Sequence, residues 1–225
     1  MSEHLPKVAI VDYMLGNLFS VKQACAHVGL EAIITSDKKI IQDSDAVILP
    51  GVGAYGDAMA ALCRLDLVSI LCEIADSPKP LVGICLGVQL LMTESFEFGR
   101  HKGLGIIEGQ VLRFDNPREG ERILKVPQIG WNRIRPAVNT CWGNTLLRGV
   151  AEGEYMYFVH SYFVQPKDHG VILSVSRYGN IDFCSSIQRK NVFACQFHPE
   201  RSGAAGIRLY QNLAAQLKTM ISGTK

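Results

Sequence analysis

The segment Val82-Gly83-Ile84-Cys85-Leu86-Gly87-Val88-Gln89-Leu90-Leu91 joins a strand-like apolar run to a helix-like one. Within it, Gly83-Ile84-Cys85-Leu86-Gly87 has the G-x-nucleophile-x-G pattern of a sharp strand-to-helix turn, with cysteine at the nucleophile position. The two glycines suit such a turn because its backbone segments approach each other too closely for side chains. A thiol presented there would lie at a helix N-terminus, where the helix dipole favours the thiolate. The alternative is that Cys85 is a buried core cysteine, which is a common position for a free thiol.

The composition is that of a globular protein with enough apolar material for a full core. Of 225 residues, 48% are hydrophobic and 20% are charged, and no low-complexity linker divides the chain, so we expect a single domain over residues 1–225. The net charge of +2 without a basic run gives no indication of nucleic-acid binding. No apolar stretch is long enough to span a membrane, and the N-terminus lacks the apolar region of a signal peptide. The seven cysteines form no CxxC pair, which is typical of free thiols in a reducing compartment and predicts a cytoplasmic location.

The first half of the chain alternates short apolar strands with helices. Strands are predicted at residues 7–11, 31–34, 45–49 and 80–84, and helices at 18–28, 55–74 and 86–92. Asn17 is predicted to cap the first helix. The alternation predicts an α/β fold with a doubly wound, mainly parallel sheet flanked by helices. Ligands of such sheets bind beyond the carboxyl ends of the strands, where Asp12, Gly51 and Cys85 fall.

The second half of the chain is richer in strands. They are predicted at residues 106–114, 123–134, 155–164, 171–178, 182–188 and 192–196, separated by turn residues. This pattern predicts an additional antiparallel β layer, followed by a C-terminal helix that begins near Ser202. The last strand and this helix then complete the α/β fold.

A second motif, Cys195-Gln196-Phe197-His198-Pro199-Glu200, supplies what a thiol nucleophile needs. The strand that ends there brings His198 to an end of the sheet, and Glu200 follows two residues later. A nucleophilic thiol requires a base, and the base requires a group that orients its imidazole. The predicted catalytic residues are therefore Cys85, His198 and Glu200. His-x-Glu alone is weak evidence, because a lone histidine is more often structural, and a structural role is the first interpretation of the other histidines, His160 included.

A third motif, Pro50-Gly51-Val52-Gly53, directly follows a predicted strand. Its glycines allow backbone N–H groups to turn toward a bound oxyanion, beside the N–H of Leu86 that follows the nucleophile. A simple Pro-Gly turn would explain the same residues. Combined with the other two motifs, however, the segment completes the groups that acyl transfer requires, with oxyanion donors at Val52 or Gly53 and at Leu86.

These motifs resemble the class I, triad-type glutamine amidotransferases, and the resemblance covers essentially the whole chain. Finer features resemble one group within that class, the glutaminase subunits of imidazole glycerol phosphate synthase from histidine biosynthesis. Those features are Val11-Asp12-Tyr13 with Gly16-Asn17-Leu18, Pro50 to Gly53, Pro127-Gln128-Ile129-Gly130-Trp131-Asn132, and Tyr157-Phe158-Val159-His160-Ser161-Tyr162.

The resemblance implies glutamine hydrolysis on a class I glutamine amidotransferase-like fold. Cys85 would attack the side-chain amide carbon and form a γ-glutamyl thioester, His198 would carry the protons, and Glu200 would stabilise the imidazolium. Water would then release glutamate, without any metal or organic cofactor. The family pattern gives the glutamine-binding role to Gly53, Gln89, Ser161 and Tyr162.

The resemblance also implies a partner. Ammonia would pass into a (β/α)8-barrel synthase subunit, in a heterodimer that makes imidazole glycerol phosphate and aminoimidazole carboxamide ribotide, and the isolated chain would be almost inactive. Trp131 suits an interface anchor, although a core position is an equally good interpretation. Arg201 is interpreted either as the partner of an acidic residue on the barrel or as a solvated arginine at a helix start. The segments that face the partner in this family contain Asn17, Gln128, Trp131, Asn132, Tyr157 and Arg201.

Departures from the family pattern leave alternatives open. Met14-Leu15 replaces the usual Gly-Met, Val88 replaces a methionine, and Gln128 replaces a histidine. None of them is a triad residue, but they are compatible with a paralogous glutaminase subunit that supplies ammonia to another acceptor synthase, as in the amidation of surface-polysaccharide sugars. Glutaminase subunits of anthranilate or pyridoxal phosphate synthesis are a further alternative, against which Gly130-Trp131-Asn132 argues.

Two alternatives from other functional classes use the same residues differently. A free-standing Cys-His-Glu hydrolase predicts full turnover without a partner and no preference for glutamine. A non-catalytic interaction protein on this scaffold would usually have lost a triad residue, whereas all three are present.

Overall fold

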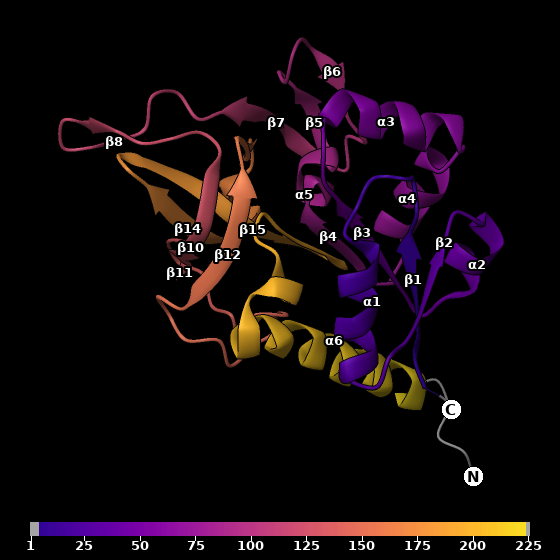
Figure 1. Cartoon of the computed structure of the whole chain (residues 1–225). Coiled ribbons are helices and arrows are strands. Elements are labelled where there is room, and N and C mark those ends of the chain that lie inside the picture. Colours follow the sequence, from indigo (N-terminus) through magenta and orange to yellow (C-terminus); the bar gives the residue numbers. More distant parts are fainter. Residues whose placement is uncertain (1–4, 224–225) are drawn as a thin grey trace.

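The computed structural model describes residues 5–223, which fold around one large mixed β-sheet (Figure 1). Its strands follow the order β2-β1-β3-β4-β16-β15-β13-β7-β5-β6, with β14 and β11 pairing beside β15. The first five strands in this order run parallel, as a doubly wound sheet requires. They are β2 (Glu31–Thr35), β1 (Lys7–Val11), β3 (Ala46–Gly51), β4 (Leu81–Cys85) and β16 (Val192–Cys195).

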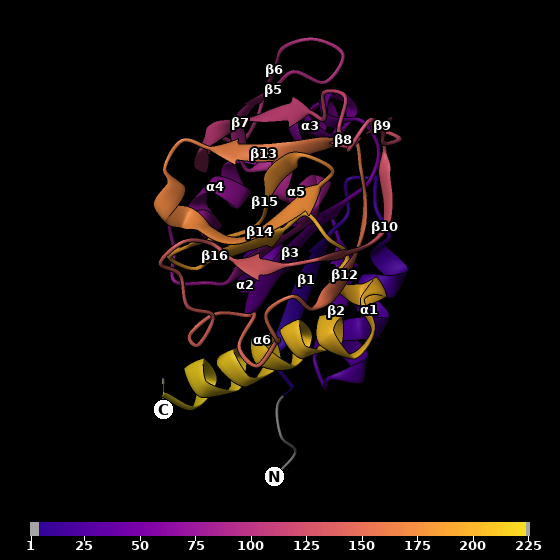
Figure 2. The same ribbon diagram turned by 90° about the vertical axis from the view of Figure 1, so that its left-hand side faces the viewer.

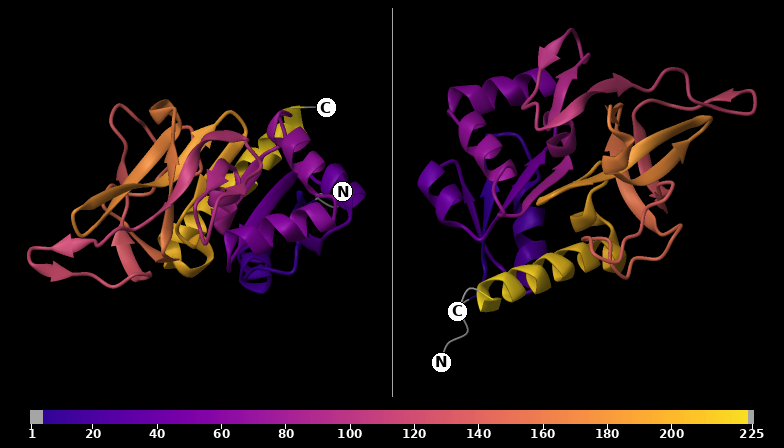
Figure 3. Two further views of the ribbon diagram at one scale, coloured as in Figure 1. Left: turned by 90° about the horizontal axis from the view of Figure 1, so that it is seen from above. Right: turned by 180° about the vertical axis from the view of Figure 1, so that it is seen from behind.

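Helices cover both faces of the parallel part. Successive residues of a strand point to opposite faces, so Val8 and Ile10 of β1 join one core cluster while Ala9 and Val11 join the other. Figure 3 shows the long α6 on the opposite side of the sheet from α3 and α4. The first cluster holds α1 (Leu18–His27) and α6 (Gly203–Gly223), and the second holds α2 (Lys38–Asp43), α3 (Tyr55–Arg64) and α4 (Val68–Ala75).

The second half of the chain adds the antiparallel strands that its sequence predicts (Figure 2). Beyond β16 the main sheet continues with β15 (Ile181–Arg189), β14 (Ile172–Tyr178), β13 (Tyr162–Pro166), β11 (Arg135–Pro136), β7 (Ile107–Arg113), β5 (Met92–Ser95) and β6 (His101–Lys102). A separate two-stranded ribbon pairs β10 (Gln128–Arg133) with β12 (Tyr155–His160), and β8 (Arg118–Glu119) pairs with β9 (Arg122–Ile123). The predicted fold class is therefore confirmed.

The predicted helix at 55–74 is wrong in one respect, because the structure divides it into α3 and α4. Asp66 adopts a left-handed conformation with φ of 54° after α3. The N–H of Leu67 donates to the carbonyl of Leu62, and the N–H of Asp66 donates to the carbonyl of Cys63. This is a Schellman C-cap, which glycine usually supplies. An aspartate in the cap position left the helix end without its usual sequence signal.

Other element boundaries also differ from the predicted ones. The helix after Cys85, α5 (Leu86–Leu90), ends early because Met92–Ser95 is already β5. The predicted strand 123–134 is split between β9 and β10, and the predicted strand 155–164 is split at Ser161, so that β12 and β13 join different sheets. Helix α2 was not predicted, although Asp37 caps it by accepting from the N–H groups of Lys39 and Ile40.

Asn17 occupies the N-cap position of α1, but its side chain makes no capping hydrogen bond there. That part of the predicted cap is wrong. Within residues 5–223, no helix combines the length and hydrophobicity that a membrane crossing needs.

Candidate active site

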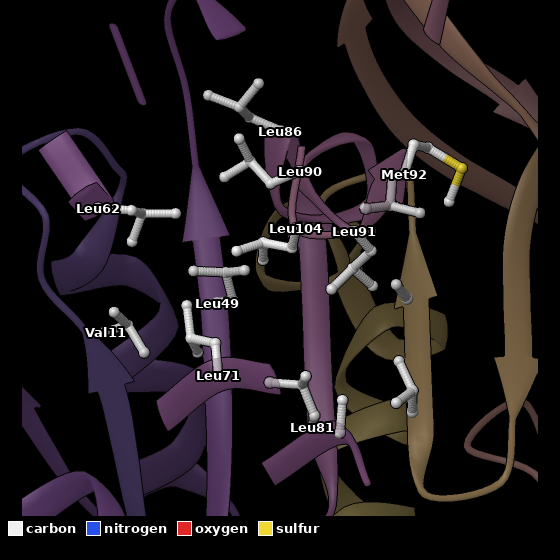
Figure 4. Packing of buried hydrophobic residues seen from close by; sticks show 14 of the residues in the cluster. Val11, Leu49, Leu62, Leu71, Leu81, Leu86, Leu90, Leu91, Met92 and Leu104 are labelled. Carbon is white, nitrogen blue, oxygen red and sulfur yellow. The ribbon is translucent and has the colours of Figure 1, made fainter. Parts of the chain in front are cut away.

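The nucleophile turn is built from backbone that leaves no space for side chains. Cys85 ends β4 and precedes α5 with φ of 54° and ψ of −108°, a strained conformation for a residue with a Cβ. A Cβ on Gly87 would lie 1.9 Å from the carbonyl oxygen of Leu49, and one on Gly83 would lie 2.8 Å from the Cβ of Ala194. In Figure 4, Leu86 and Leu90 of α5 lie in the same core cluster as Leu49 of β3. The packing of Gly83 against Ala194 and of Gly87 against Leu49 therefore holds Cys85 in its strained conformation.

The histidine and carboxylate of the second motif form a buried pair. His198 Nδ1 lies 2.8 Å from Glu200 Oε1, and the two side chains are 4% and 1% exposed. The backbone N–H of His198 donates to the carbonyl of Tyr157, and the Ser202 hydroxyl donates to the carbonyl of His198. Glu200 lies in a short 3-10 turn, η2 (Pro199–Arg201), that follows directly. The turn places the carboxylate on one ring nitrogen and leaves Nε2 without a hydrogen-bond partner in good geometry.

The charge state of His198 depends on its two acidic neighbours. Burial lowers the pKa of the imidazole, but Cys85 as a thiolate and the Glu200 carboxylate together raise it to about 10. A thiolate at Cys85 therefore favours the charged form of the imidazole. An adjacent cation of this kind is what activates a cysteine nucleophile.

A cavity of about 270 Å³ opens beside Cys85. The residues that were predicted to donate to an oxyanion or to bind substrate converge on it from three segments of the chain. Its lining consists of Val52, Gly53, Cys85, Leu86, Gln89, Glu97, Pro127, Val159, His160, Ser161 and Tyr162. The sequence interpretation did not assign Glu97, Pro127 or Val159 to the site. Glu97 follows a strand, and no local signal distinguishes it from Glu94, which instead pairs with Arg100 at the surface.

Tyr13 holds the segment from Pro50 to Gly53 in place. The fully buried Tyr13 hydroxyl donates to the Pro50 carbonyl at 2.7 Å. A Cβ on Gly51 would lie 2.0 Å from that hydroxyl oxygen, so only glycine fits there. Gly53 has φ of 102°, which is a left-handed value that glycine adopts freely. These contacts fix the part of the cavity wall that Val52 and Gly53 form.

Replacing Tyr13 by phenylalanine should lower the free energy of unfolding by about 1–3 kcal/mol, because it leaves the buried Pro50 carbonyl without a partner. Urea denaturation measures the loss. Tyr178→Phe is a matched control, since Tyr178 also donates to a carbonyl at 2.7 Å, but at the surface. Equal losses in the two variants would contradict the role given to burial.

His160 contributes to the lining of the cavity and is also packed into the core. It is buried, its Nδ1 lies 2.8 Å from the Tyr162 carbonyl oxygen, and its ring contacts Phe114, Phe158 and Phe183. Burial lowers its pKa from 6.5 to about 4, so the imidazole is neutral and Nδ1 carries the proton toward Tyr162.

This lowered pKa predicts a loss of stability in acid. Between pH 6.5 and 4 the unfolded chain binds a proton on His160 that the folded chain does not bind, so folding weakens by about 3 kcal/mol as the pH falls through this window. His160→Asn keeps a donor for Tyr162 but cannot titrate. In urea denaturation at a series of pH values, the difference in the free energy of unfolding between wild type and His160→Asn should therefore decrease toward pH 4. Parallel curves for His160→Asn would contradict the prediction.

The residues predicted to face a partner differ in exposure, because those on the β10–β12 ribbon lie on its two opposite faces. Trp131 is 56% exposed and packs edge-on against Tyr157, with ring centroids 6.0 Å apart. The Arg201 guanidinium lies 4.6 Å from the centroid of the Tyr157 ring. The core interpretation of Trp131 is therefore wrong, and Trp142 is the buried tryptophan.

The other three residues predicted to face a partner are less exposed than Trp131. Gln128 is only 4% exposed, on the opposite face of the ribbon from Trp131. Asn132 is half-buried and donates through Nδ2 to the Arg177 carbonyl, and Asn17 is half-buried at the start of α1. The alternation follows from the two-residue period of a strand. Among residues 5–223, no group of three or more His, Cys, Asp and Glu side chains is placed to hold a metal ion.

Comparison with known proteins agrees with the fold and identifies the family. The family model for glutamine amidotransferase class-I matches residues 9–216. Imidazole glycerol phosphate synthase subunit HisH of Syntrophotalea carbinolica is 44% identical over 210 residues, which cover 91% of this chain and 98% of that protein. The subunit HisH of Aquifex aeolicus is 42% identical over 210 residues, covering 92% of this chain and 95% of that protein.

Solved structures at low sequence identity show the same fold. The structure of PurLQS from Thermotoga maritima is similar with a TM-score of 0.72 and 20% identity, covering 95% of this chain and all of that one. A crystal structure of a glutamine amidotransferase has a TM-score of 0.68 and 19% identity, covering 92% of this chain and 98% of that one. The chain therefore belongs to the class I glutamine amidotransferases and, within them, to the family of imidazole glycerol phosphate synthase subunit HisH.

Proposed function

We propose that this chain hydrolyses glutamine to glutamate and ammonia as the glutaminase subunit of an imidazole glycerol phosphate synthase in histidine biosynthesis. One observation carries the proposal. Cys85 lies in a strained turn at the wall of a cavity, and a thiolate there raises the pKa of the His198 imidazole, whose Nδ1 is held 2.8 Å from a buried carboxylate. Relatives that are 41–45% identical carry the name of that subunit, which supports the choice of glutamine as substrate.

Each residue of the triad has a distinct task in this mechanism. The Cys85 thiolate attacks the side-chain amide carbon of glutamine and forms a γ-glutamyl thioester. His198 takes the thiol proton and then gives it to the departing ammonia, through the Nε2 atom that Glu200 leaves free. Glu200 holds the imidazole in one orientation and stabilises its charged form. Water then attacks the thioester and releases glutamate.

Backbone N–H groups stabilise the charge that develops on the amide oxygen. Leu86 supplies one donor, because its N–H follows the nucleophile at the start of α5, and Val52 or Gly53, which also line the cavity, supplies the other. Glycine at position 53 allows the peptide before it to reorient, which would let a bound partner complete the oxyanion hole.

The cavity also carries groups for the amino-acid end of the substrate. Gly53, Gln89, Ser161 and Tyr162 surround the place where glutamine would lie. Glu97 is the one carboxylate among the described cavity-lining residues, and it is fixed by accepting a hydrogen bond from the N–H of Tyr55. We assign to Glu97 the α-ammonium group of glutamine.

Glu97→Gln should raise the KM for glutamine by about tenfold or more, because the charge-assisted contact with the ammonium group is lost. The kcat should change much less, since the substituted side chain is remote from the reacting amide and its amide oxygen can still accept from Tyr55. Steady-state glutamate release measures both constants. Glu108→Gln removes a surface carboxylate that pairs with Lys167 and should leave KM unchanged; an equal rise there would contradict the assignment.

The proposed partner is a (β/α)8-barrel synthase subunit that receives the ammonia in a cytoplasmic heterodimer, with residues 1–225 acting as one domain. The exposed side chains of Trp131 and Arg201 pack on the half-buried Tyr157 ring, and together they supply aromatic and cationic anchors of the kind that interfaces use. The chemistry assigned to the triad requires no metal and no organic cofactor.

Glutamate release from glutamine, with and without the (β/α)8 synthase subunit of the same organism and its ligand, tests this function. We expect near-zero release by the chain alone and strong activation by the partner. Full activity alone, without glutamine preference, would favour a free-standing hydrolase. No activation by that partner would favour a different acceptor synthase.

A further inference from the structure

A pair of buried side-chain amides connects the substrate-binding strand to the nucleophile. Gln89 Nε2 donates to the Tyr162 carbonyl at 2.9 Å and to Gln196 Oε1 at 3.1 Å. Gln196 Nε2 in turn lies 3.8 Å from Cys85 Sγ, and Gln196 is fully buried. The two glutamines are 107 residues apart in the sequence. The connection exists only in the folded chain.

The Tyr162 carbonyl determines how the two side-chain amides are oriented. The Tyr162 carbonyl can only accept, so the amide group of Gln89 must present nitrogen to it. The second hydrogen of that nitrogen then points at Gln196, so Gln196 must accept it through its amide oxygen. The remaining end of Gln196, its NH₂ group, is therefore directed at the sulfur of Cys85.

The sulfur has a competing neighbour that favours its protonated form. Cys85 Sγ lies 3.9 Å from the Val159 carbonyl oxygen, which can accept from a thiol but repels a thiolate. A donor on the other side has the opposite preference, because hydrogen bonds to the charged form favour that form. Gln196 is thus placed to counteract Val159 and to define one position for the sulfur.

We propose that Gln196 is a positioning residue that donates a hydrogen bond to the Cys85 thiolate, with its orientation imposed by Gln89 and the Tyr162 carbonyl. The proposal rests on the proposed role of Cys85 as nucleophile and extends it. The titratable groups around the sulfur come from several elements: His198 and Glu200 after β16, Cys195 in β16, Tyr13 after β1, Glu97 after β5, and His160 in β12. Gln196 does not titrate, so replacing it leaves each of these charges in place.

Alkylation of Cys85 by iodoacetamide as a function of pH tests the proposal, because only the thiolate reacts. The rate is followed on the Cys85 peptide by mass spectrometry, which separates it from the six other cysteines. Gln196→Met keeps the length of the side chain but removes the donor, and the midpoint of the rate profile should rise by about one to two pH units. Gln196→Glu turns an acceptor or a charge toward the sulfur and should raise the midpoint further. Gln165→Met, at the surface away from Cys85, is the control and should leave it unchanged.

An unchanged midpoint in folded Gln196→Met and Gln196→Glu would overturn the proposal and leave Gln196 as a packing residue. The unsubstituted chain offers a second measurement that needs no variant: the side-chain NH₂ signals of Gln196 in an NMR titration should move with the same midpoint as the alkylation rate. Signals that do not move across that midpoint would equally overturn it. Alkylation requires no turnover, so a wild-type chain that shows these shifts but releases no glutamate even in the complex with the synthase subunit would remove the proposed function and retain the hydrogen bond from Gln196 to Cys85.

Discussion

Replacing Cys85 by alanine is expected to abolish glutamine hydrolysis, with a fall in kcat of about 10⁴-fold or more. The other members of the triad cannot substitute for the thiol, because His198 and Glu200 are arranged to move and stabilise a proton and neither presents a free nucleophile to the cavity. The fold should be unaffected, since alanine fits wherever the cysteine backbone and Cβ fit. Glutamate release in the complex with the synthase subunit measures the effect.

A second cysteine variant provides the control for Cys85→Ala. Cys72 is a half-buried thiol in α4, outside the cavity lining, and Cys72→Ala should retain wild-type turnover. If Cys85→Ala kept more than about one per cent of the wild-type kcat, the covalent mechanism would be contradicted.

Gly87→Ala is expected to lower the free energy of unfolding by about 3 kcal/mol or more, because an inserted methyl group meets backbone that cannot move alone. The added Cβ would lie 1.9 Å from the Leu49 carbonyl oxygen. Leu49 belongs to β3, which pairs with both β1 and β4, so relieving the clash displaces the centre of the sheet or the start of α5. A displaced α5 would also move the N–H of Leu86 and reduce glutaminase activity in the molecules that still fold.

Urea denaturation measures this loss, and Gly143→Ala is the matched control. The Cβ of that variant would meet Cys141 Sγ at 3.5 Å, an ordinary contact at the surface, so its stability should change by about 0.5 kcal/mol or less. Equal stabilities for Gly87→Ala and Gly143→Ala would contradict the tight nucleophile turn.

The parallel half of the fold could be predicted from the sequence because its signals are local. Buried parallel strands are short apolar runs, and Gly83 and Gly87 around Cys85 mark the turn that joins one of them to a helix. The cavity followed from the same rule, since the carboxyl ends of parallel strands meet at one edge of the sheet. These features depend on residues that are close together in the chain.

The features that could not be predicted depend on contacts between distant segments or on atypical residues. Asp66 ends α3 in a position that glycine usually occupies, and a single residue, Ser161, separates two strands that belong to different sheets. The inward turn of Glu97 depends on an N–H group of α3, and the contact of Gln196 with Cys85 depends on Gln89. Periodicity specifies which face of an element is buried, but not which polar side chains meet there.

The central claim is that Cys85 carries the γ-glutamyl group during turnover. Acid quenching of the complex with its synthase partner during glutamine hydrolysis, followed by peptide mass spectrometry, tests this claim directly. We expect one glutamyl group on the peptide that contains Cys85, and none on the same peptide of Cys85→Ala. Turnover of glutamine without that adduct, or with a glutamyl group on another residue, would contradict the mechanism.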